Sequence, residues 1–489
     1  MPHKSQFQPL GLFLSLPVVW AVLLGLLAAR LSAIGLSPLG PGVDEAQYWL
    51  WGQTPQLGYY SKPPLIAWIL AASGSVFDAQ IFSLRGPAPV LHLLTALLLW
   101  QTGSVLFSAR AGRLAALLWS SLPAVGLGSF VMSTDTPMLL FWTAGLFCFA
   151  SALRTHSNIY LWLICCGLCI GLSALSKYAG LYFIIGIFFW CLTDRTRPAS
   201  QRAALFAVFC AAVFITSVPT WAWNFSNGFV TILHLGENAN LEDSQMSAAG
   251  IVSFWGAQFA VFGPVSLVLL GFALIRSGRS EADDRLHLFV WPVLGIITLQ
   301  AFLKEANANW AVAAYPAATL LVSHLITDSR SRLIRAAGQT ALLANLAICA
   351  VLITVTATGS LGALAPASDP LRHLRGWQVL ADQTSRTASS TDAGTIIAFN
   401  RESAALLHWH LRQTGPQIVL PRLGPGAGNH YHRTYPLRAQ SPRPLLALTD
   451  TADPPDHLAV QADWRGPVAT SEVRISARDT RRVWFWTAD

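Results

Sequence analysis

Residues 11–34 read "GLFLSLPVVWAVLLGLLAARLSAI" and contain one charged side chain, that of Arg30. A helix needs about 20 apolar residues to cross the hydrocarbon core of a bilayer, and this run is long enough. The apolar region of a cleaved signal peptide spans about 7–15 residues, so we expect a retained first helix. Strands of membrane barrels alternate in polarity over about 10 residues, which this uniform run does not do.

Similar apolar runs recur over the first 360 residues. The whole chain is 53% hydrophobic and 11% charged, whereas soluble domains carry about 25% charged residues. We therefore predict a polytopic α-helical membrane protein with about 11 transmembrane helices. The other predicted spans are 84–107, 112–130, 137–153, 158–175, 178–193, 203–222, 250–275, 286–303, 308–326 and 334–357.

The net charge of +8 does not indicate nucleic acid, because the basic residues are scattered between apolar runs. Arginines gather in alternate joints between the spans, which under the positive-inside rule predicts a cytoplasmic N-terminus. The segments 35–83, 131–136, 223–249 and 304–307 then face the opposite side, together with the C-terminus. The arginines of the cytoplasmic joints are Arg110, Arg113, Arg154, Arg195, Arg197, Arg202, Arg276, Arg279, Arg285, Arg330, Arg332 and Arg335.

The amino-acid composition of the chain changes after about residue 360. Short apolar segments such as "GTIIAFN", "QIVL" and "PLLALTD" indicate strands, and "VRISARDTRRVWFW" is typical of a closing hairpin. The segment "ESAALLHWHLRQ" predicts a helix between strands. We predict a transmembrane domain over 1–360 and a small soluble α/β domain over 361–489. His430 and His432 are expected in a surface loop rather than in a metal site.

The outer loop 35–83 contains "GPGVDEAQYWLWGQTPQLGYYSKPP" at residues 40–64. Asp44 and Glu45 stand beside an aromatic, amphipathic segment suited to a membrane interface, where the pKa of a carboxylate can be tuned for general-base work. Alternatively, Asp44 caps the helix that follows. Lys62 offers a point charge for a phosphate at the membrane surface, or its side chain only reaches along the interface to water.

Two more ionisable residues lie at predicted helix ends on the same side. Asp135 occurs in "MSTDTPMLLFW", where capping of a helix with Pro137 in its first turn is the alternative explanation. Lys177 occurs in the apolar stretch "LSALSKYAGLYF". A lysine in such a stretch is a functional hypothesis by default, and a side chain reaching to water from a short outer turn is the alternative.

Amides and aromatic rings occur together in two further outer segments, "PTWAWNFSNGFVTILH" and "KEANANWAVAAYP". Such residues suit polyhydroxylated ligands through stacking and hydrogen bonds. Polar loops with tryptophans at the membrane interface explain the pattern equally well. The candidate substrate-binding residues of these segments are Asn224, His234, Asn309 and Trp310.

The order of these motifs resembles a known family. "DEAQYWLWGQTPQLGYYSKPPLIAWIL", "STDTPMLLFW", "SKYAGLYF", "WNFSNGFVTILH" and "NWAVAAYPA" are similar to the bacterial glycosyltransferases related to dolichyl-phosphate-mannose–protein mannosyltransferases. This is glycosyltransferase family 39 in the broad sense, with lipid A aminoarabinose transferases as more distant relatives. All have the membrane-embedded GT-C fold. The similarity extends over about residues 10–325, and the Asp-Glu pair is its most specific motif.

The resemblance implies an inverting transfer of a sugar from a polyprenyl-phosphate donor to an acceptor such as a glycolipid, lipid A or a protein. Asp44 matches the general base of the family, and Glu45 would support it. Lys62 and Lys177 would bind the donor phosphate, and Asp135 would contact substrate or metal. Tyr59 and Tyr60 join the predicted substrate-binding residues.

No cofactor is required by the predicted reaction, although Asp44, Asp135 and a phosphate are suitable ligands for Mg²⁺ or Mn²⁺. The chain departs from the family at Ser61, where several relatives carry an acid or a histidine, so the sugar preference does not transfer. The implied location is a bacterial inner membrane with a periplasmic active face.

The main alternative function is a transporter or flippase for a lipid-linked or sugar substrate. A transporter predicts acids at mid-membrane depth and broken helices, whereas the acids of this chain lie at helix ends on one side. A non-catalytic membrane scaffold is the second alternative, and it leaves the outer acids and lysines unexplained.

Overall fold

The computed structural model describes residues 14–489 apart from 78–80, 155–157, 240–245, 277–278, 363–368, 413–414, 423–427, 456–457, 459–461 and 477. Contacts divide the chain into two compact units. The first comprises the chain up to Gly35, Lys62–Ile66 and Arg85–Thr354. The second comprises Leu36–Ser61, Ala67–Leu84 and Val355–Asp489. The first three residues of the predicted span 11–34 lie outside the described residues.

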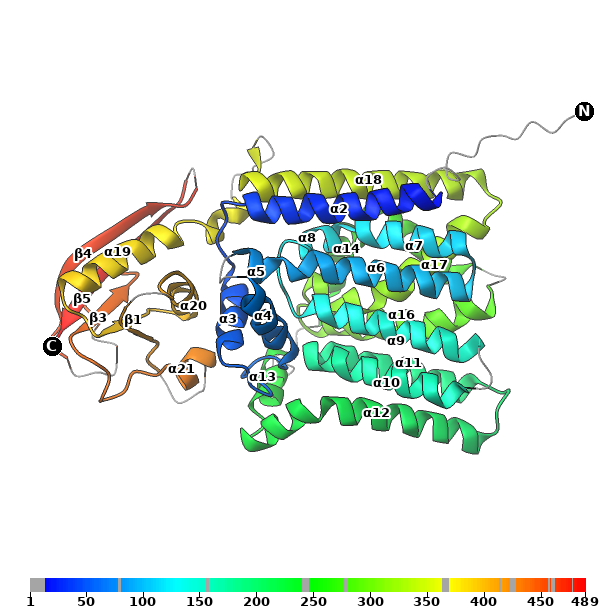
Figure 1. The fold of residues 1–489 in the computed structure, drawn as a ribbon, viewed down its shortest axis with the longest axis horizontal. Coiled ribbons are helices and arrows are strands. Elements are labelled where there is room, and N and C mark those ends of the chain that lie inside the picture. The colour runs from blue at the N-terminus through cyan, green and yellow to red at the C-terminus, as the bar shows by residue number, and fades with distance from the viewer. Residues whose placement is uncertain are drawn as a thin grey trace, which may run out of the picture. The chain divides into compact units, whose positions relative to one another are not determined.

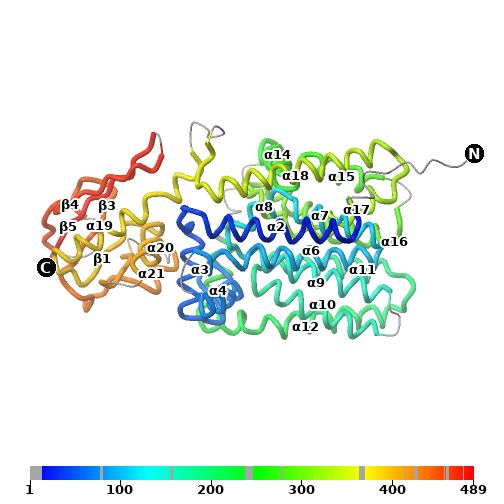
Figure 2. Tube along the Cα trace, turned by 45° about the horizontal axis from the view of Figure 1, so that its top comes forward, coloured from blue at the N-terminus to red at the C-terminus, as the bar shows by residue number. Residues whose placement is uncertain are grey.

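The first unit is a bundle of helices that run side by side (Figures 1 and 2). Among the described residues, eight helices are long and apolar enough to cross a membrane, or nine if one bent pair counts as a span. The protein is therefore a multi-pass membrane protein, as predicted. The eight are α2 (Leu16–Leu36), α5 with α6 (Ile81–Leu106), α9 (Asp135–Arg154), α10 (Ile159–Ser176), α12 (Ala199–Ser226), α16 (Glu281–Leu303), η4 with α17 (Ala308–Asp328) and α18 (Arg332–Thr358).

Three predicted spans are shorter or broken, because proline or glycine interrupts the apolar run. The run 112–130 forms α7 (Ala109–Ser121) and α8 (Pro123–Gly128). The run 178–193 begins as a 3₁₀ turn, η2 (Tyr178–Leu181), and continues as α11 (Tyr182–Thr193). The run 250–275 forms α14 (Ala248–Phe262) and α15 (Pro264–Ile275), bent by 110° at Gly263, which has φ 86°. All eleven predicted runs contain helix, and the exact number of spans stays a prediction.

Close helix contacts in the bundle depend on small residues, as is usual in membranes. A Cβ atom at Gly112 of α7 would lie 2.2 Å from the carbonyl oxygen of Trp100 in α6, so only glycine fits there. The buried Arg30 of α2 contacts residues of α7 and α18. Its guanidinium donates a 2.6 Å hydrogen bond to the carbonyl of Ser120 and contacts Cys349 Sγ of α18 at 3.8 Å.

The C-terminal part of the second unit is a five-stranded mixed sheet with helices, which confirms the predicted small α/β domain. The strand order is β2-β1-β3-β5-β4, with β1 parallel to β2 and β3, and β5 antiparallel to β3 and β4. The predicted closing hairpin is β4–β5. The elements are η6 (Pro370–Leu374), α19 (Trp377–Ser390), β1 (Thr395–Ile397), α20 (Arg401–His410), β2 (Gln417–Val419), α21 (His430–Thr434), β3 (Leu445–Thr449), β4 (Arg465–Arg474) and β5 (Thr480–Ala488).

The second unit also contains the segment around the Asp-Glu pair, with α3 (Val43–Gln53), most of α4 (Leu65–Val76) and α5 (Ile81–Arg85). Trp49 of α3 packs edge-to-face on Trp409 of α20, with ring centroids 5.0 Å apart. Trp51 packs edge-to-face on His430 at 5.5 Å. The expected surface loop is therefore wrong for His430, which lies in the short helix α21 and is 8% exposed because Trp51 covers it.

Candidate active site

Helix α3 presents the Asp-Glu pair in its first turn. Gly42 precedes the helix in an extended conformation, and its N–H donates a 2.9 Å hydrogen bond to Oε2 of Glu45. Glu45 is buried and fixes the start of the helix, with its charge favourably placed at the N-terminus. The alternative that Asp44 caps the helix is therefore wrong, because the capping contact belongs to Glu45 and the side chain of Asp44 is 64% exposed.

Asp44 forms an ion pair with Arg401, the first residue of α20. The Nη2 group of Arg401 donates to Oδ1 of Asp44, and its Nε donates a 3.0 Å hydrogen bond to Oε1 of Gln47. Asp44 and Gln47 are three residues apart and so lie on one face of α3. One guanidinium of the C-terminal domain therefore bridges the predicted base and its helical neighbour.

Arg401 was not among the residues predicted from the sequence. Asn400 caps α20 by accepting the N–H of Ser403 at 2.8 Å, which places Arg401 in the first helical turn. A cation there opposes the helix dipole. This unfavourable position is the one local signal that Arg401 has a partner elsewhere, and the sequence does not identify that partner.

The tyrosines of the outer loop are buried. Tyr59 is 2% exposed and stacks on Trp51 at 4.5 Å. Its hydroxyl donates to the carbonyl of Trp51 at 3.0 Å and accepts the N–H of Gln56 at 2.9 Å. Burial raises the pKa of Tyr59 to about 12. Tyr60 is also buried. These contacts indicate that the two side chains hold the loop, while their predicted substrate contacts stay predictions.

Asp135 and Lys177, distant in sequence, meet in the first unit. Asp135 begins α9, and Lys177 is the extended residue between α10 and η2. The Nζ of Lys177 lies 2.6 Å from Oδ1 of Asp135, and Nδ2 of Asn309 donates to Oδ2 of the same carboxylate at 2.9 Å. The two charged side chains are 19% and 15% exposed, and Trp310 beside Asn309 is half-buried. The structure thus assembles three predicted residues and places Trp310 next to them.

Asn224 lies in a buried polar network of the first unit. Its Nδ2 donates to the hydroxyl of Tyr178 at 3.2 Å and to the carbonyl of Thr220 at 2.9 Å, while the Tyr178 and Thr220 hydroxyls are 2.9 Å apart. Tyr178 and Thr220 are further polar residues that sequence reasoning missed. His234 lies half-buried in α13 (Val230–Ala239).

Lys62 and the two predicted metal ligands do not all belong to one unit. Lys62 belongs to the first unit and is half-buried. Asp44 belongs to the second unit and Asp135 to the first, and the metal site predicted for this pair stays a prediction. Within the described ranges, no group of three or more His, Cys, Asp or Glu side chains comes together as a metal site.

The arginine-rich joints of the first unit gather at one end of the bundle. Three arginines from different joints line a common cavity. They are Arg154 at the end of α9, Arg197 after α11 and Arg285 in the first turns of α16. Asp135 lies at the opposite end of α9, and this 20-residue helix spans about 30 Å. Three arginines of different predicted cytoplasmic joints therefore lie at one end of the bundle, and the alternation of all the joints stays a prediction.

Comparison with known proteins first defines the class of this fold. The crystal structure of ArnT from Cupriavidus metallidurans in the apo state superposes with a TM-score of 0.66 at 14% identity, covering 97% of this chain and 98% of that chain. The same protein bound to undecaprenyl phosphate gives a TM-score of 0.62 at 14% identity, covering 96% and 97%. The fold is that of the membrane-embedded GT-C glycosyltransferases.

Sequence comparison then defines the family. Residues 61–223 match the family described as dolichyl-phosphate-mannose-protein mannosyltransferase. The lipid A galacturonosyltransferase RgtD of Rhizobium johnstonii is 32% identical over 418 residues, which cover 84% of this chain and 86% of the relative. The chain belongs to glycosyltransferase family 39 in the broad sense and is a membrane glycosyltransferase. This assignment replaces the transporter and scaffold alternatives.

Proposed function

We propose that the protein transfers a galacturonosyl group from a polyprenyl-phosphate donor to a lipid A-type glycolipid. The observation that carries this proposal is the 32% identity to the lipid A galacturonosyltransferase over 84% of the chain. A protein acceptor is the alternative, and the description of the family matched by residues 61–223 favours it.

The proposed reaction is a single displacement with inversion at the anomeric carbon of the donor. The acceptor hydroxyl oxygen forms a bond to this carbon while the bond from the carbon to the phosphate oxygen breaks. Asp44 takes the hydroxyl proton, and the electron pair leaves with the polyprenyl phosphate. General-base catalysis contributes typically about 10²–10⁴-fold. The 64% exposed carboxylate of Asp44 is accessible to an acceptor, which the buried carboxylate of Glu45 is not.

Lys62 and Lys177 are assigned to the donor phosphate, where negative charge develops as the leaving group departs. Asp135 holds the end of the Lys177 side chain through a 2.6 Å contact, and Asn309 donates a 2.9 Å hydrogen bond to the other oxygen of this carboxylate. A phosphate that binds Lys177 shares the ammonium with Asp135, so we assign Asp135 to positioning this lysine.

Arg401 is assigned to positioning Asp44. Its planar guanidinium is held by Gln47 through Nε at 3.0 Å and therefore fixes the carboxylate in one orientation. A carboxylate that is paired with a cation can act as a general base only if one of its two oxygens stays available to the acceptor hydroxyl. The pair uses Oδ1 of Asp44, which leaves Oδ2 for the incoming hydroxyl.

The proposed location is a bacterial inner membrane, with the N-terminus in the cytoplasm and the C-terminal domain in the periplasm. The gathering of Arg154, Arg197 and Arg285 at one end of the bundle supports this orientation, because arginine-rich joints face the cytoplasm. Asp135 and Lys177 then face the periplasm. No metal is needed for the proposed step, since the lysines supply the positive charge at the phosphate.

The test follows consumption of a panel of polyprenyl-phosphate sugars by mass spectrometry, in membranes that contain lipid A and either wild type or Asp44→Asn. Asp382→Asn is the matched control, because Asp382 is an exposed acid of the same unit and accepts a 2.7 Å hydrogen bond from Gln378.

We expect wild type and Asp382→Asn to consume the galacturonosyl donor. Asp44→Asn is expected to consume it about 10²-fold or more slowly. Consumption of a different donor would overturn the sugar assignment. Equal turnover by wild type and Asp44→Asn would overturn the role of Asp44, and sugar recovered on protein instead of lipid A would overturn the acceptor.

A further inference from the structure

A cavity of about 820 Å³ lies in the first unit, at the arginine-rich end of the bundle. The ends of α6, α9 and α11 and the start of α16 surround it. Its lining combines apolar side chains, among them Phe107 and Trp190, with the guanidinium groups of Arg154, Arg197 and Arg285. Helix α9 separates this end from Asp135 by about 30 Å, so the cavity is distinct from the candidate active site.

The lining carries an excess of positive charge. Arg197 is paired with Asp194, and although burial raises the pKa of that carboxyl, hydrogen bonds from Thr196 and Arg197 hold it below its usual value. Arg285 pairs at 3.0 Å with Glu281, whose side chain is 80% exposed. Arg154 donates to the carbonyl of Leu106 at 3.1 Å and has no carboxylate partner among the described residues.

Two features show that the arginines have unused donor capacity. The Nε of Arg285 is buried and has no hydrogen-bond partner in the described part of the chain, although the rest of its side chain borders the cavity. The pairing acid Glu281 is in solvent, and exposed pairs of this kind contribute little stability. An anion in the cavity would find two guanidinium groups that are not committed to buried carboxylates.

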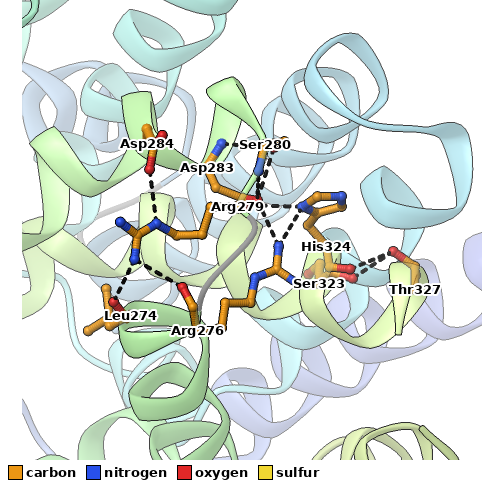
Figure 3. A network of polar contacts seen from close by, with 9 residues as sticks. All are labelled: Leu274, Arg276, Arg279, Ser280, Asp283, Asp284, Ser323, His324 and Thr327. Carbon is orange, nitrogen blue, oxygen red and sulfur yellow. Dashed lines mark hydrogen bonds and ion pairs between the residues drawn. The ribbon is translucent and has the colours of Figure 1, made fainter. Parts of the chain in front are cut away.

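One wall of the cavity is held rigidly by the network in Figure 3. Asp283 is 1% exposed and accepts hydrogen bonds from Arg276 at 2.7 Å, His324 at 2.9 Å and the Ser280 hydroxyl at 2.9 Å. His324 in turn stacks on Phe107, with ring centroids 3.9 Å apart. This network links α16 and α17 to Arg276, the residue after α15 (Figure 3).

We propose that this cavity binds the phosphate headgroup of an anionic phospholipid. Basic pockets between transmembrane helices on the cytoplasmic side suit such headgroups, and guanidinium groups bind phosphate oxygens through paired N–H donors. The apolar side chains beside the arginines match the glycerol and first acyl carbons of a lipid, which a soluble phosphate lacks. The inference does not depend on the sugar or acceptor of the proposed function.

The test uses the full chain purified in detergent and measures lipid binding by native mass spectrometry. The lipids are phosphatidylglycerol and phosphatidylcholine, and inorganic phosphate is added in excess as a competitor. The variant is Arg154→Gln/Arg285→Gln. The control, Arg330→Gln/Arg332→Gln, removes the same charge from exposed positions of another predicted cytoplasmic joint. Arg154→Lys keeps the charge and tests whether a substitution at this position disturbs folding.

We expect wild type to retain phosphatidylglycerol in preference to phosphatidylcholine, and each arginine removed to weaken binding about fivefold. The control is expected to bind as wild type does, and Arg154→Lys, which keeps the charge but lacks the paired N–H donors, is expected to bind more weakly than wild type and more tightly than the double variant. Equal binding by the cavity variant, or an equal loss in the control, would overturn the proposal. Complete displacement of the lipid by inorganic phosphate would show that the site takes soluble phosphate and would overturn its assignment to a lipid.

Discussion

Replacement of Arg401 by alanine separates two roles of the ion pair with Asp44. The two side chains are 40% and 64% exposed, and an exposed pair stabilises a fold by about 0.2–1 kcal/mol. Arg401→Ala is therefore expected to lower the free energy of unfolding by about 1 kcal/mol or less. If Arg401 also positions the carboxylate, a misplacement of about 1 Å lowers kcat about 10²-fold.

The assay measures kcat and KM for the donor in detergent-solubilised protein, together with thermal unfolding. Because the ion pair acts on the base and not on the donor, kcat is expected to fall while KM stays unchanged. Arg401→Lys keeps the charge but lacks the planar guanidinium that also binds Gln47. We therefore expect this variant to recover only part of the wild-type kcat. Arg482→Ala is the control, since Arg482 forms a 2.8 Å pair with Glu472 in the same domain at 60% and 58% exposure.

Three results would refute this reasoning. Wild-type kcat in Arg401→Ala would show that the pair is a surface contact only. An equal fall in kcat for Arg482→Ala would show a general effect on the domain. Loss of turnover in Arg401→Ala with normal turnover in Asp44→Asn would reject Asp44 as the base, and would leave Arg401 with a role of its own.

Three further predictions concern phosphate, protons and metal. Lys177→Met is expected to lower kcat about 100-fold, with activity retained in Lys177→Arg, and equal loss in both variants would show that the position tolerates only lysine for structural reasons. Burial lowers the pKa of His430 to about 3 and of His408 to about 4, whereas the unfolded value is about 6.5. The unfolded chain therefore binds more protons in this interval, and the free energy of unfolding should fall as the pH drops from about 6.5 to about 4. Thermal unfolding measured across this pH range checks the prediction. An unfolding temperature that does not change with pH would contradict it. Turnover is expected to survive EDTA, and a loss restored by Mg²⁺ or Mn²⁺ would instead support Asp44 and Asp135 as metal ligands.

The membrane class and the helices were predictable because they depend on local composition. An apolar run near 20 residues is sufficient evidence of a helix in lipid. The breaks were not predicted, because averaging over a run hides single residues such as Pro123 and Gly263. The strands and the β4–β5 hairpin were predicted from alternation and turn residues, whereas helix α19 was not, since its sequence carries many Ser, Thr and Gln residues.

The sequence indicated candidate site residues one by one but not the contacts between them. Asp135 and Lys177 were chosen because charged residues at apolar helix ends need an explanation. Their 2.6 Å contact joins residues 42 positions apart, which no local pattern reveals. Arg401 lies 357 positions from Asp44, directly before the segment that the sequence predicted as a helix. Tyr59 was predicted only as a substrate-binding residue, and the burial of its ring against Trp51 is a further contact that the sequence did not indicate.

The packing of α3 against α20 limits how far the chain can be treated as modular. A truncation after about residue 360 would remove Trp409 from Trp49, His430 from Trp51 and the guanidinium from Asp44. The remaining chain would therefore present two uncovered tryptophans and an unpaired carboxylate in its first outer loop. Inactivity of such a truncated protein would not distinguish an accessory domain from a catalytic one, and point substitutions at the contact surface are the informative experiment.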